Sequence, residues 1–397
     1  MTDSEPTIRA TDAKRRATVL QVLPGLVSGG VERGTVDMAQ ALVAAGWNSL
    51  VASAGGPMVR EIERAGATHI TLPLASKNPL VMRANVRRLA EIIRQHGVDI
   101  VHARSRAPAW SARSAAKRAG AHFVTTFHNA YRGKSWLKRR YNAVMAEGER
   151  VIAISRFVAE HAASVYRVPW DRLRIVHRGV DVKRFDPEKV AAERIVRLAG
   201  EWRLPDGVPI VMLPARVSRW KGHTVLIEAM RRLNRPQVHV LLVGGGGSPR
   251  YQASLTQAIR RAGSAVTFRM LGECRDMPAA YMLADIVVSA STEPEGFGRV
   301  TVEAQAMGRP VIATAHGGSA ETVVPGETGW LVPPGDAAAL AEAIGRALDL
   351  PAEERRALAL REIAHVRADF SIAVMAARTI AVYEELLGPA SHGTPAA

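Results

Sequence analysis

Two glutamates, Glu295 and Glu303, flank a Gly-Phe-Gly turn in the stretch EPEGFGRVTVEA, residues 293–304. The turn follows an expected strand and opens an expected helix, so backbone N–H groups of the first helical turn are free to meet a ligand. Carboxylates accept hydrogen bonds from neighbouring hydroxyl groups. We therefore interpret Glu295 and the turn as contacts to a sugar and Glu303 as a contact to a second diol. An acidic helix start explains Glu295 alone, but it leaves the turn of Gly296, Phe297 and Gly298 unexplained.

Two cations lie five residues apart in PARVSRWKG, residues 214–222, at the end of another expected strand. Arg216 and Lys221 could neutralise a diphosphate while its bond to a leaving carbon breaks, since fixed charges of this kind stabilise transfer transition states. A pair of solvated surface charges is the alternative.

Glycine turns follow two expected strands, one in GLVSGGVERG, residues 25–34, and one in VGGGG, residues 243–247. Glycine lets a ligand approach the backbone, and a helix N-terminus favours an anion, so Gly29 with Gly30 and Gly244 with Gly245 are candidates for donor binding. Tight strand-to-helix connections also need glycine. Neither stretch has the full G-x-G-x-x-G or G-K-[ST] pattern, so they do not identify a nucleotide class by themselves.

The elements that must position these residues alternate between apolar runs and helical stretches. This alternation predicts an α/β fold with parallel sheets covered by helices on both faces, and ligands bind such sheets at the carboxyl ends of the strands. The first series predicts strands at 17–26, 48–56, 67–74, 98–105, 122–129 and 150–157, with helices at 28–46, 83–97 and 108–120. The second predicts strands at 209–217, 238–245, 265–272, 285–292, 310–317 and 329–334, with helices at 222–233, 251–262, 277–283, 300–308, 319–323 and 336–348.

A chain of 397 residues exceeds what one hydrophobic core usually supports, so we predict two domains. They are expected at 17–190 and 191–370, with a charged, proline-flanked connection around 182–208. A last helix at 371–387 is expected to return to the first domain. Residues 1–16 are expected to form a mobile tail and 388–397 a second tail.

Charge is concentrated in the first half, where residues 1–190 carry 31 Lys and Arg against 16 Asp and Glu, while the remainder carries 22 against 21. This asymmetry indicates an anionic partner such as a membrane surface, a phosphorylated acceptor or nucleic acid; an Arg-rich proteome is the other explanation. The segment YRGKSWLKRRYNAV, residues 131–144, combines five basic residues with Trp136, Tyr131 and Tyr141, a composition suited to an anionic membrane interface or to a solvated helix face.

The expected localisation is cytoplasmic, at the inner face of the membrane if residues 131–144 contact lipid. The single cysteine, Cys274, cannot form an internal disulfide, and no segment is as apolar as a membrane span. We interpret the apolar run after Lys14 as a first strand rather than a secretion signal, because Gln21 and Pro24 interrupt it.

Over most of residues 17–387 the chain resembles the retaining GT-B glycosyltransferases of family 4, also called glycosyl transferases group 1. The E-x7-E element at Glu295 and Glu303 is the most specific part of the resemblance. It implies two Rossmann-like domains facing each other across a deep cleft. It also implies that Glu295 and the following turn hold the donor sugar, that Glu303 binds the nucleotide ribose, and that Arg216 and Lys221 grip the diphosphate.

The resemblance assigns two further parts of the site. Gly29 and Gly30 in GGVE would lie near the donor phosphate and the acceptor, and His128 in TTFHN would be the active-site histidine. A single histidine after an apolar strand is otherwise more often a structural residue. The chain departs from the family at SASTEPEGFG, which lacks the usual Pro-Ser, and at 244–247, where glycine replaces the acidic residue of VGDG, so the nucleotide base stays open.

The activity implied by the resemblance is transfer of a sugar, with retention, from a GDP- or UDP-sugar to a hydroxyl of a lipid-linked, lipopolysaccharide or polysaccharide acceptor. No cofactor or metal is expected, because the sequence has no Asp-x-Asp motif and protein cations can stabilise the leaving diphosphate. Two alternatives are a sugar-nucleotide epimerase of the same architecture and a non-catalytic protein that binds anionic ligands. Nucleic acid is not an expected partner, since no recognised nucleic-acid module is present.

Overall fold

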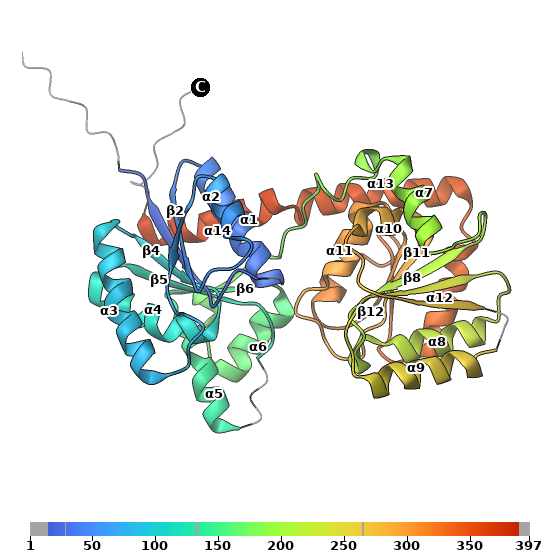
Figure 1. Cartoon of the computed structure of the whole chain (residues 1–397), viewed down its shortest axis with the longest axis horizontal. Coiled ribbons are helices and arrows are strands. Elements are labelled where there is room, and N and C mark those ends of the chain that lie inside the picture. Colours follow the sequence, from blue (N-terminus) through green and yellow to red (C-terminus); the bar gives the residue numbers. More distant parts are fainter. Residues whose placement is uncertain (1–14, 28, 132, 134, 264–265, 389–397) are drawn as a thin grey trace, which may run out of the picture. The chain divides into compact units, whose positions relative to one another are not determined.

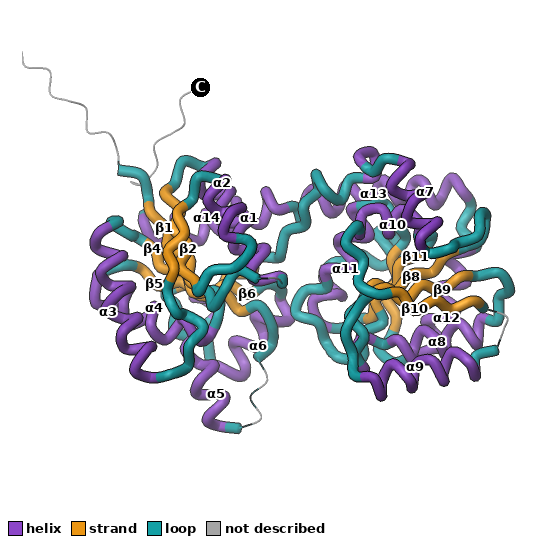
Figure 2. The backbone as a smooth tube through the Cα atoms, in the orientation of Figure 1, coloured by secondary structure: helices purple, strands orange, loops and turns teal. Residues whose placement is uncertain are grey.

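The computed structural model describes residues 15–27, 29–131, 133, 135–263 and 266–388. The two predicted tails therefore lie outside the described residues, except for residues 15, 16 and 388. Two parallel sheets carry helices on their faces (Figures 1 and 2), which confirms the predicted α/β class with two Rossmann-like domains.

The first sheet has seven strands in the order β3-β2-β1-β4-β5-β6-β7. Strand β1 (Thr18–Val22) is fully buried and pairs in parallel with β2 and β4, as expected for a strand covered on both faces. Strand β7 was not predicted, because its three residues are too few to show an alternating or apolar pattern. The other strands are β2 (Asn48–Ser53), β3 (Thr68–Thr71), β4 (Ile100–Ala103), β5 (His122–Phe127), β6 (Arg150–Ala153) and β7 (Leu173–Ile175).

Helices connect these parallel strands, since a hairpin cannot. Two local features fix the start of helix α3. The Asn78 side chain accepts a hydrogen bond from Leu80 N at 2.9 Å, and Pro79 occupies the first helical position. The helices are α1 (Gly30–Ala44), α2 (Val59–Arg64), α3 (Pro79–Gln95), α4 (Arg106–Ala119), α5 (Trp136–Asn142) and α6 (Arg156–Tyr166).

The second sheet has six strands in the order β10-β9-β8-β11-β12-β13. Its core is built from aliphatic side chains, including Val211, Val240 and Ile312, packed against Leu226 and Ile344 of the covering helices. The strands are β8 (Ile210–Pro214), β9 (His239–Val243), β10 (Thr267–Leu271), β11 (Ile286–Ser289), β12 (Val311–Thr314) and β13 (Trp330–Val332).

The helices of the second half agree with the prediction in most places. The helix predicted at 319–323 is a short 3-10 segment, Gly317–Glu321, and helix α13 (Ala352–Asp369) was missed. The inner face of α13 buries Leu358, Glu362 and Val366, and the charged residue in this set obscures the apolar pattern. The remaining helices are α7 (Ala192–Glu201), α8 (His223–Leu233), α9 (Pro249–Arg261), α10 (Met277–Leu283), α11 (Arg299–Ala306), α12 (Ala337–Leu348) and α14 (Ile372–Leu387).

Contacts between Cα atoms group the described chain into two compact units. The first unit contains the chain up to Thr126, Arg140–Val151 and the chain from Ala376 onward; the second contains Phe127–Arg139 and Ile152–Met375. The domain boundaries expected from the sequence stay a prediction.

Within the first unit, a buried histidine ties helix α14 to the sheet. Tyr383 Oη lies 2.7 Å from His102 Nδ1, and His102 Nε2 lies 2.6 Å from Thr126 Oγ1. Complete burial holds the pKa of His102 well below its ordinary value, so this imidazole is neutral at pH 7.

Candidate functional site

The lysine and the first glutamate of the predicted site form an ion pair in the second unit. Lys221 Nζ lies 2.8 Å from Glu295 Oε1, and their side chains are only 14% and 13% exposed. Ser291 Oγ donates to the same carboxylate oxygen. The contact arises because β8 and β11 are neighbours in the sheet, so the loops that follow them meet at its carboxyl edge.

Gly222, directly after the lysine, is required by this close approach. Its φ is 74°, and a Cβ there would lie 1.8 Å from the carbonyl oxygen of Ala290. Any other residue would push the turn that carries Lys221 away from the end of β11. The backbone at Gly222 therefore sets the position of the ammonium group.

The Gly-Phe-Gly turn packs against the segment that follows β12. Gly318 N donates to Glu295 O at 2.9 Å, and a Cβ at Gly298 would lie 2.5 Å from Ser319 Oγ. The Phe297 ring is buried, with its centroid 5.9 Å from that of Phe370. Phe297 therefore anchors the turn, and any contact it makes to a donor is through its backbone.

His128 lies next to this turn in the second unit. A Cβ at Gly296 would lie 3.1 Å from the carbonyl oxygen of His128 and 3.3 Å from Asn129 Oδ1. Within the second unit, the structure thus brings residues 128 and 129 together with the turn after β11, two stretches far apart in the sequence.

Glu303 is buried on helix α11, and both of its carboxylate oxygens accept hydrogen bonds. Tyr281 Oη donates to Oε2 at 3.0 Å, and Arg299 Nη2 donates to Oε1 at 2.6 Å. Complete burial, together with the charge of Glu303, raises the pKa of Tyr281 well above its ordinary value, so the phenol stays a donor.

Sequence reasoning missed both partners of Glu303. The i,i+4 spacing of Arg299 and Glu303 on one helix could have revealed the arginine. No local signal links Tyr281 of α10 to Glu303, because only tertiary packing brings the two helices together.

Arg216 lies beside the glycine loop, residues 243–247, and has no hydrogen bond or ion pair to any residue in the described ranges. Its side chain is exposed, and a Cβ at Gly246 would lie 3.2 Å from its Cγ. Gly244 has φ 152°, and a Cβ there would lie 2.2 Å from the carbonyl oxygen of Ala215. Gly245 accepts a hydrogen bond from Val217 N at 3.0 Å. The loop therefore needs glycine to pack against the end of β8, and a donor role for Gly244 and Gly245 stays a prediction.

Gly29 and Gly30 open helix α1 in the first unit, whereas the other predicted site residues belong to the second. Gly29 has φ 127°, and a Cβ there would lie 2.6 Å from Glu32 Oε2. The glutamate of GGVE thus folds back over the start of its own helix.

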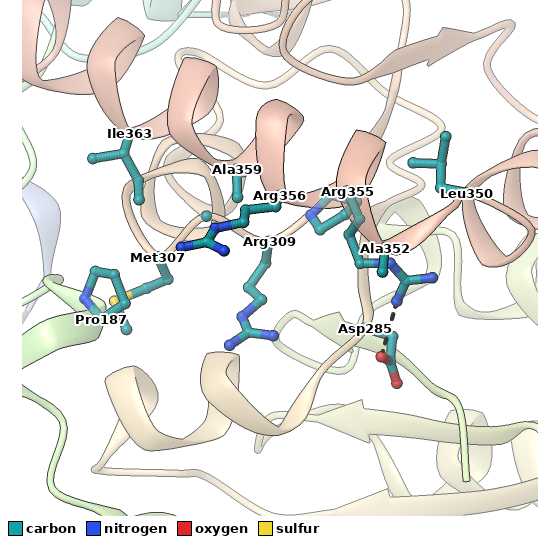
Figure 3. Close-up of a pocket in the computed structure, with 12 residues that line it drawn as sticks. Pro187, Asp285, Met307, Arg309, Leu350, Ala352, Arg355, Arg356, Ala359 and Ile363 are labelled. Atoms are coloured by element: carbon teal, nitrogen blue, oxygen red, sulfur yellow. Dashed lines mark hydrogen bonds and ion pairs between the residues drawn. The ribbon is translucent and has the colours of Figure 1, made fainter. Parts of the chain in front are cut away.

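A separate cavity of about 540 Å³ in the second unit contains none of the predicted residues (Figure 3). It lies where the end of α11 meets α13, and Arg355 there pairs with Asp285 at 3.1 Å. Arg309 Nη1 donates to Ala284 O at 3.3 Å, so both arginines have structural partners at the start of β11.

The residues that the structure describes contain no group of three or more His, Cys, Asp or Glu residues arranged to hold a metal ion. No helix among them is long and apolar enough to cross a membrane.

Family models match both halves of the chain, and a solved structure matches most of it. The family described as Glycosyl transferases group 1 matches residues 197–362, and Glycosyltransferase Family 4 matches residues 28–184. The crystal structure of a glycosyltransferase from Rickettsia africae is 37% identical, with a TM-score of 0.87, and the match covers 94% of this chain and 99% of that one.

Two curated relatives carry named activities. A GDP-mannose-dependent alpha-(1-6)-phosphatidylinositol monomannoside mannosyltransferase of Mycolicibacterium smegmatis is 32% identical over 69% of this chain and 72% of its own length. A D-inositol 3-phosphate glycosyltransferase of Nocardia farcinica is 33% identical over 62% of this chain, and the match spans about half of that relative, 54%.

Proposed function

Because the chain belongs to the glycosyl transferases group 1 family and is a nucleotide-sugar glycosyltransferase, we propose that it transfers the sugar with retention at the anomeric carbon. The proposed donor site rests mainly on one observation, the ion pair of Lys221 and Glu295 at the carboxyl edge of the second sheet. A half-buried cation held beside a carboxylate offers one group to a diphosphate and the other to sugar hydroxyls.

The donor binds through three contacts. Glu303, oriented by Tyr281 and Arg299, accepts hydrogen bonds from the nucleotide ribose. Lys221 and the exposed Arg216 bind the diphosphate, next to the glycine loop. Glu295 Oε1 already accepts from Lys221 and Ser291, so its second oxygen is the one that receives a sugar hydroxyl.

The chemical step is a front-face displacement. The bond between the anomeric carbon and the diphosphate oxygen breaks, and the acceptor oxygen bonds to the same face of that carbon. The departing diphosphate takes the acceptor proton, while Lys221 and Arg216 stabilise its charge. His128, beside Gly296, positions the sugar. The products are the nucleoside diphosphate and the glycosylated acceptor.

GDP-mannose is the first donor to test, because the name of the Mycolicibacterium smegmatis relative specifies it. UDP-sugars stay the second candidate. Two protein cations, Lys221 and Arg216, are assigned to the charge of the leaving diphosphate, so the reaction is proposed to need no divalent metal. Full activity after treatment with EDTA is expected, and restoration of lost activity by Mg²⁺ or Mn²⁺ would disprove metal independence.

The proposed acceptor is lipid-linked, and helix α5 is the proposed membrane contact. Trp136 and Leu137 are 66% and 62% exposed, and Lys138, Arg139 and Arg140 beside them are exposed as well. Aromatic and basic side chains together favour an anionic interface. Binding to phosphatidylglycerol vesicles at low salt is expected, and it should weaken when Trp136 and Leu137 are both replaced by serine. Equal binding of this double variant would exclude α5 as the contact.

The donor assignment is tested by thermal unfolding with GDP-mannose, UDP-glucose and ADP-glucose. One nucleotide class is expected to raise Tm of the wild type but not of Glu303→Ala. The control is Glu342→Ala, which removes an exposed glutamate of α12 that pairs with Arg346 and should leave the response intact. An equal response of Glu303→Ala would refute the role of Glu303. Retention is tested by the anomeric coupling constants of the product in NMR spectra, and an inverted product would refute it.

A further inference from the structure

Arg104 is a buried arginine of the first unit. It directly follows β4, and only 5% of its surface is exposed. Its side chain has no hydrogen bond or ion pair to any residue that the structure describes, and Nε is buried without an acceptor. Burial lowers the pKa of Arg104, but a guanidinium stays charged at pH 7. Buried charges are normally paired, so this one requires an explanation.

The charge of Asp37 of α1 favours the charged form of Arg104, yet no ion pair joins the two side chains, and Asp37 Oδ1 accepts from Arg33 Nε at 3.0 Å. Burial raises the pKa of Tyr383, so its phenol is neutral at pH 7 and does not offset the charge; Tyr383 Oη lies 2.7 Å from His102 Nδ1. Among the described residues, no carboxylate therefore forms an ion pair with Arg104.

The position of Arg104 is that of a ligand-binding residue. Its backbone N donates to Val22 O at 2.9 Å, so it lies at the carboxyl edge of the first sheet, where the chain leaves β1 for the glycine-containing loop before α1. Ligands of open parallel sheets bind at this edge. A planar guanidinium is suited to an oxyanion, because it can donate two parallel hydrogen bonds.

We propose that Arg104 binds a phosphate group of the acceptor and thereby selects acceptors that carry such a group near the hydroxyl that receives the sugar. The proposal rests on the proposed function in one respect, the assignment of the ligand as the acceptor. Binding of an oxyanion at Arg104 stands on the geometry of the first unit alone.

The first experiment compares thermal unfolding of the full chain in potassium phosphate and in potassium chloride at equal ionic strength. In chloride, Arg104→Met should unfold at a higher temperature than the wild type, because an apolar side chain of similar length replaces a buried charge that has no ion pair. Phosphate should raise Tm of the wild type and of the control Arg118→Met, which changes an exposed arginine of α4, but not of Arg104→Met.

Two results would overturn the proposal. A lower Tm of Arg104→Met in chloride would mean that groups of the protein already compensate the charge. An equal phosphate response of Arg104→Met and the wild type would mean that phosphate binds elsewhere.

The second experiment identifies the source of the phosphate and separates this proposal from the donor assignment. Binding of glycerol 3-phosphate is measured for the wild type and Arg104→Met, and binding to phosphatidylglycerol vesicles is measured with and without Arg104→Met in a chain that already carries Trp136→Ser and Leu137→Ser, so that α5 does not contribute. Loss of glycerol 3-phosphate binding alone indicates a soluble phosphorylated acceptor, and loss of vesicle binding indicates a lipid headgroup. Unchanged binding of both glycerol 3-phosphate and vesicles overturns the proposal. The response to GDP-mannose should be the same in Arg104→Met and the wild type, so a failed donor test leaves the result at Arg104 interpretable.

Discussion

Lys221 Nζ lies 2.8 Å from Glu295 Oε1, and the ammonium group also lies 4.3 Å from the centroid of the Trp220 ring. The carboxylate and the aromatic face fix the cation at one position before any donor arrives. A preorganised charge of this kind needs no rearrangement when charge develops on a leaving diphosphate.

Replacing this cation should remove most of the catalysis. We expect Lys221→Met to lower kcat/KM by about 10²–10³-fold, the usual cost of losing one preorganised stabilising group. Affinity for a nucleoside diphosphate should fall, and affinity for the corresponding monophosphate should fall less. Initial rates and calorimetric titration measure these effects, with the exposed Lys183→Met as control. Wild-type rates in Lys221→Met would rule out its role in leaving-group stabilisation.

Removing the hydroxyl that holds Glu303 should weaken donor binding more than it slows transfer. Tyr281→Phe keeps the buried ring but leaves Glu303 Oε2 without its donor, which should cost about 1–3 kcal/mol of stability. KM for the donor should rise while kcat changes little. The increase should shrink for a 2′,3′-dideoxy donor, which lacks the diol that Glu303 binds. An equal increase for both donors would point to a purely structural role of Tyr281.

Two glycines with the same backbone conformation should respond differently to alanine. Gly222 and Gly120 have φ values of 74° and 76°, but a Cβ meets Ala290 O at 1.8 Å only at Gly222, with nothing within 4 Å at Gly120. Gly120→Ala should cost about 1–2 kcal/mol of stability from the left-handed conformation alone. Gly222→Ala should cost clearly more and should also lower activity, because the clash displaces Lys221. Denaturant titrations of both variants measure the difference, and equal losses would contradict the steric explanation.

Glu321 should make the stability of the second unit depend on pH. It accepts hydrogen bonds from Arg156 N at 2.7 Å, from Phe157 N at 2.8 Å and from His177 Nε2 at 2.9 Å. Burial opposes the charged form, but the hydrogen bonds outweigh burial and hold the pKa of Glu321 below its ordinary value. Because the folded pKa is depressed, this stabilisation is present above the unfolded pKa of about 4.3 and is lost as pH falls through the folded pKa.

Glu321→Gln should therefore destabilise the protein by about 2 kcal/mol at pH 7, with a difference that shrinks in acid. Denaturant titration at pH 7 and at successively lower pH measures it. Glu342→Gln, on the exposed face of α12, should show no such dependence. A Glu321→Gln difference that is constant with pH would argue against the carboxylate charge as its cause.

Sequence patterns predicted most of the fold because most helices and strands have a recognisable local pattern of apolar residues and turns. The strands around Leu20, Leu241 and Ile312 are short, mostly apolar runs, each followed by a glycine-containing turn, as expected for strands buried on both faces. Strand β7 has only three residues, and α13 turns Glu362 inward, so neither leaves a readable pattern. Where the apolar pattern of an element is short or is interrupted by a buried charge, prediction from the sequence fails.

The sequence by itself determined the glutamates, the cations and the glycines of the candidate site, since residue type and spacing within one loop are local properties. Only the tertiary structure decided which of them meet. The adjacency of β8 and β11 pairs Lys221 with Glu295, and packing of α10 on α11 gives Glu303 its tyrosine. Burial is likewise a property of the folded chain, and it distinguishes Arg104, enclosed and with no ion pair to any described residue, from the many exposed arginines of the first half.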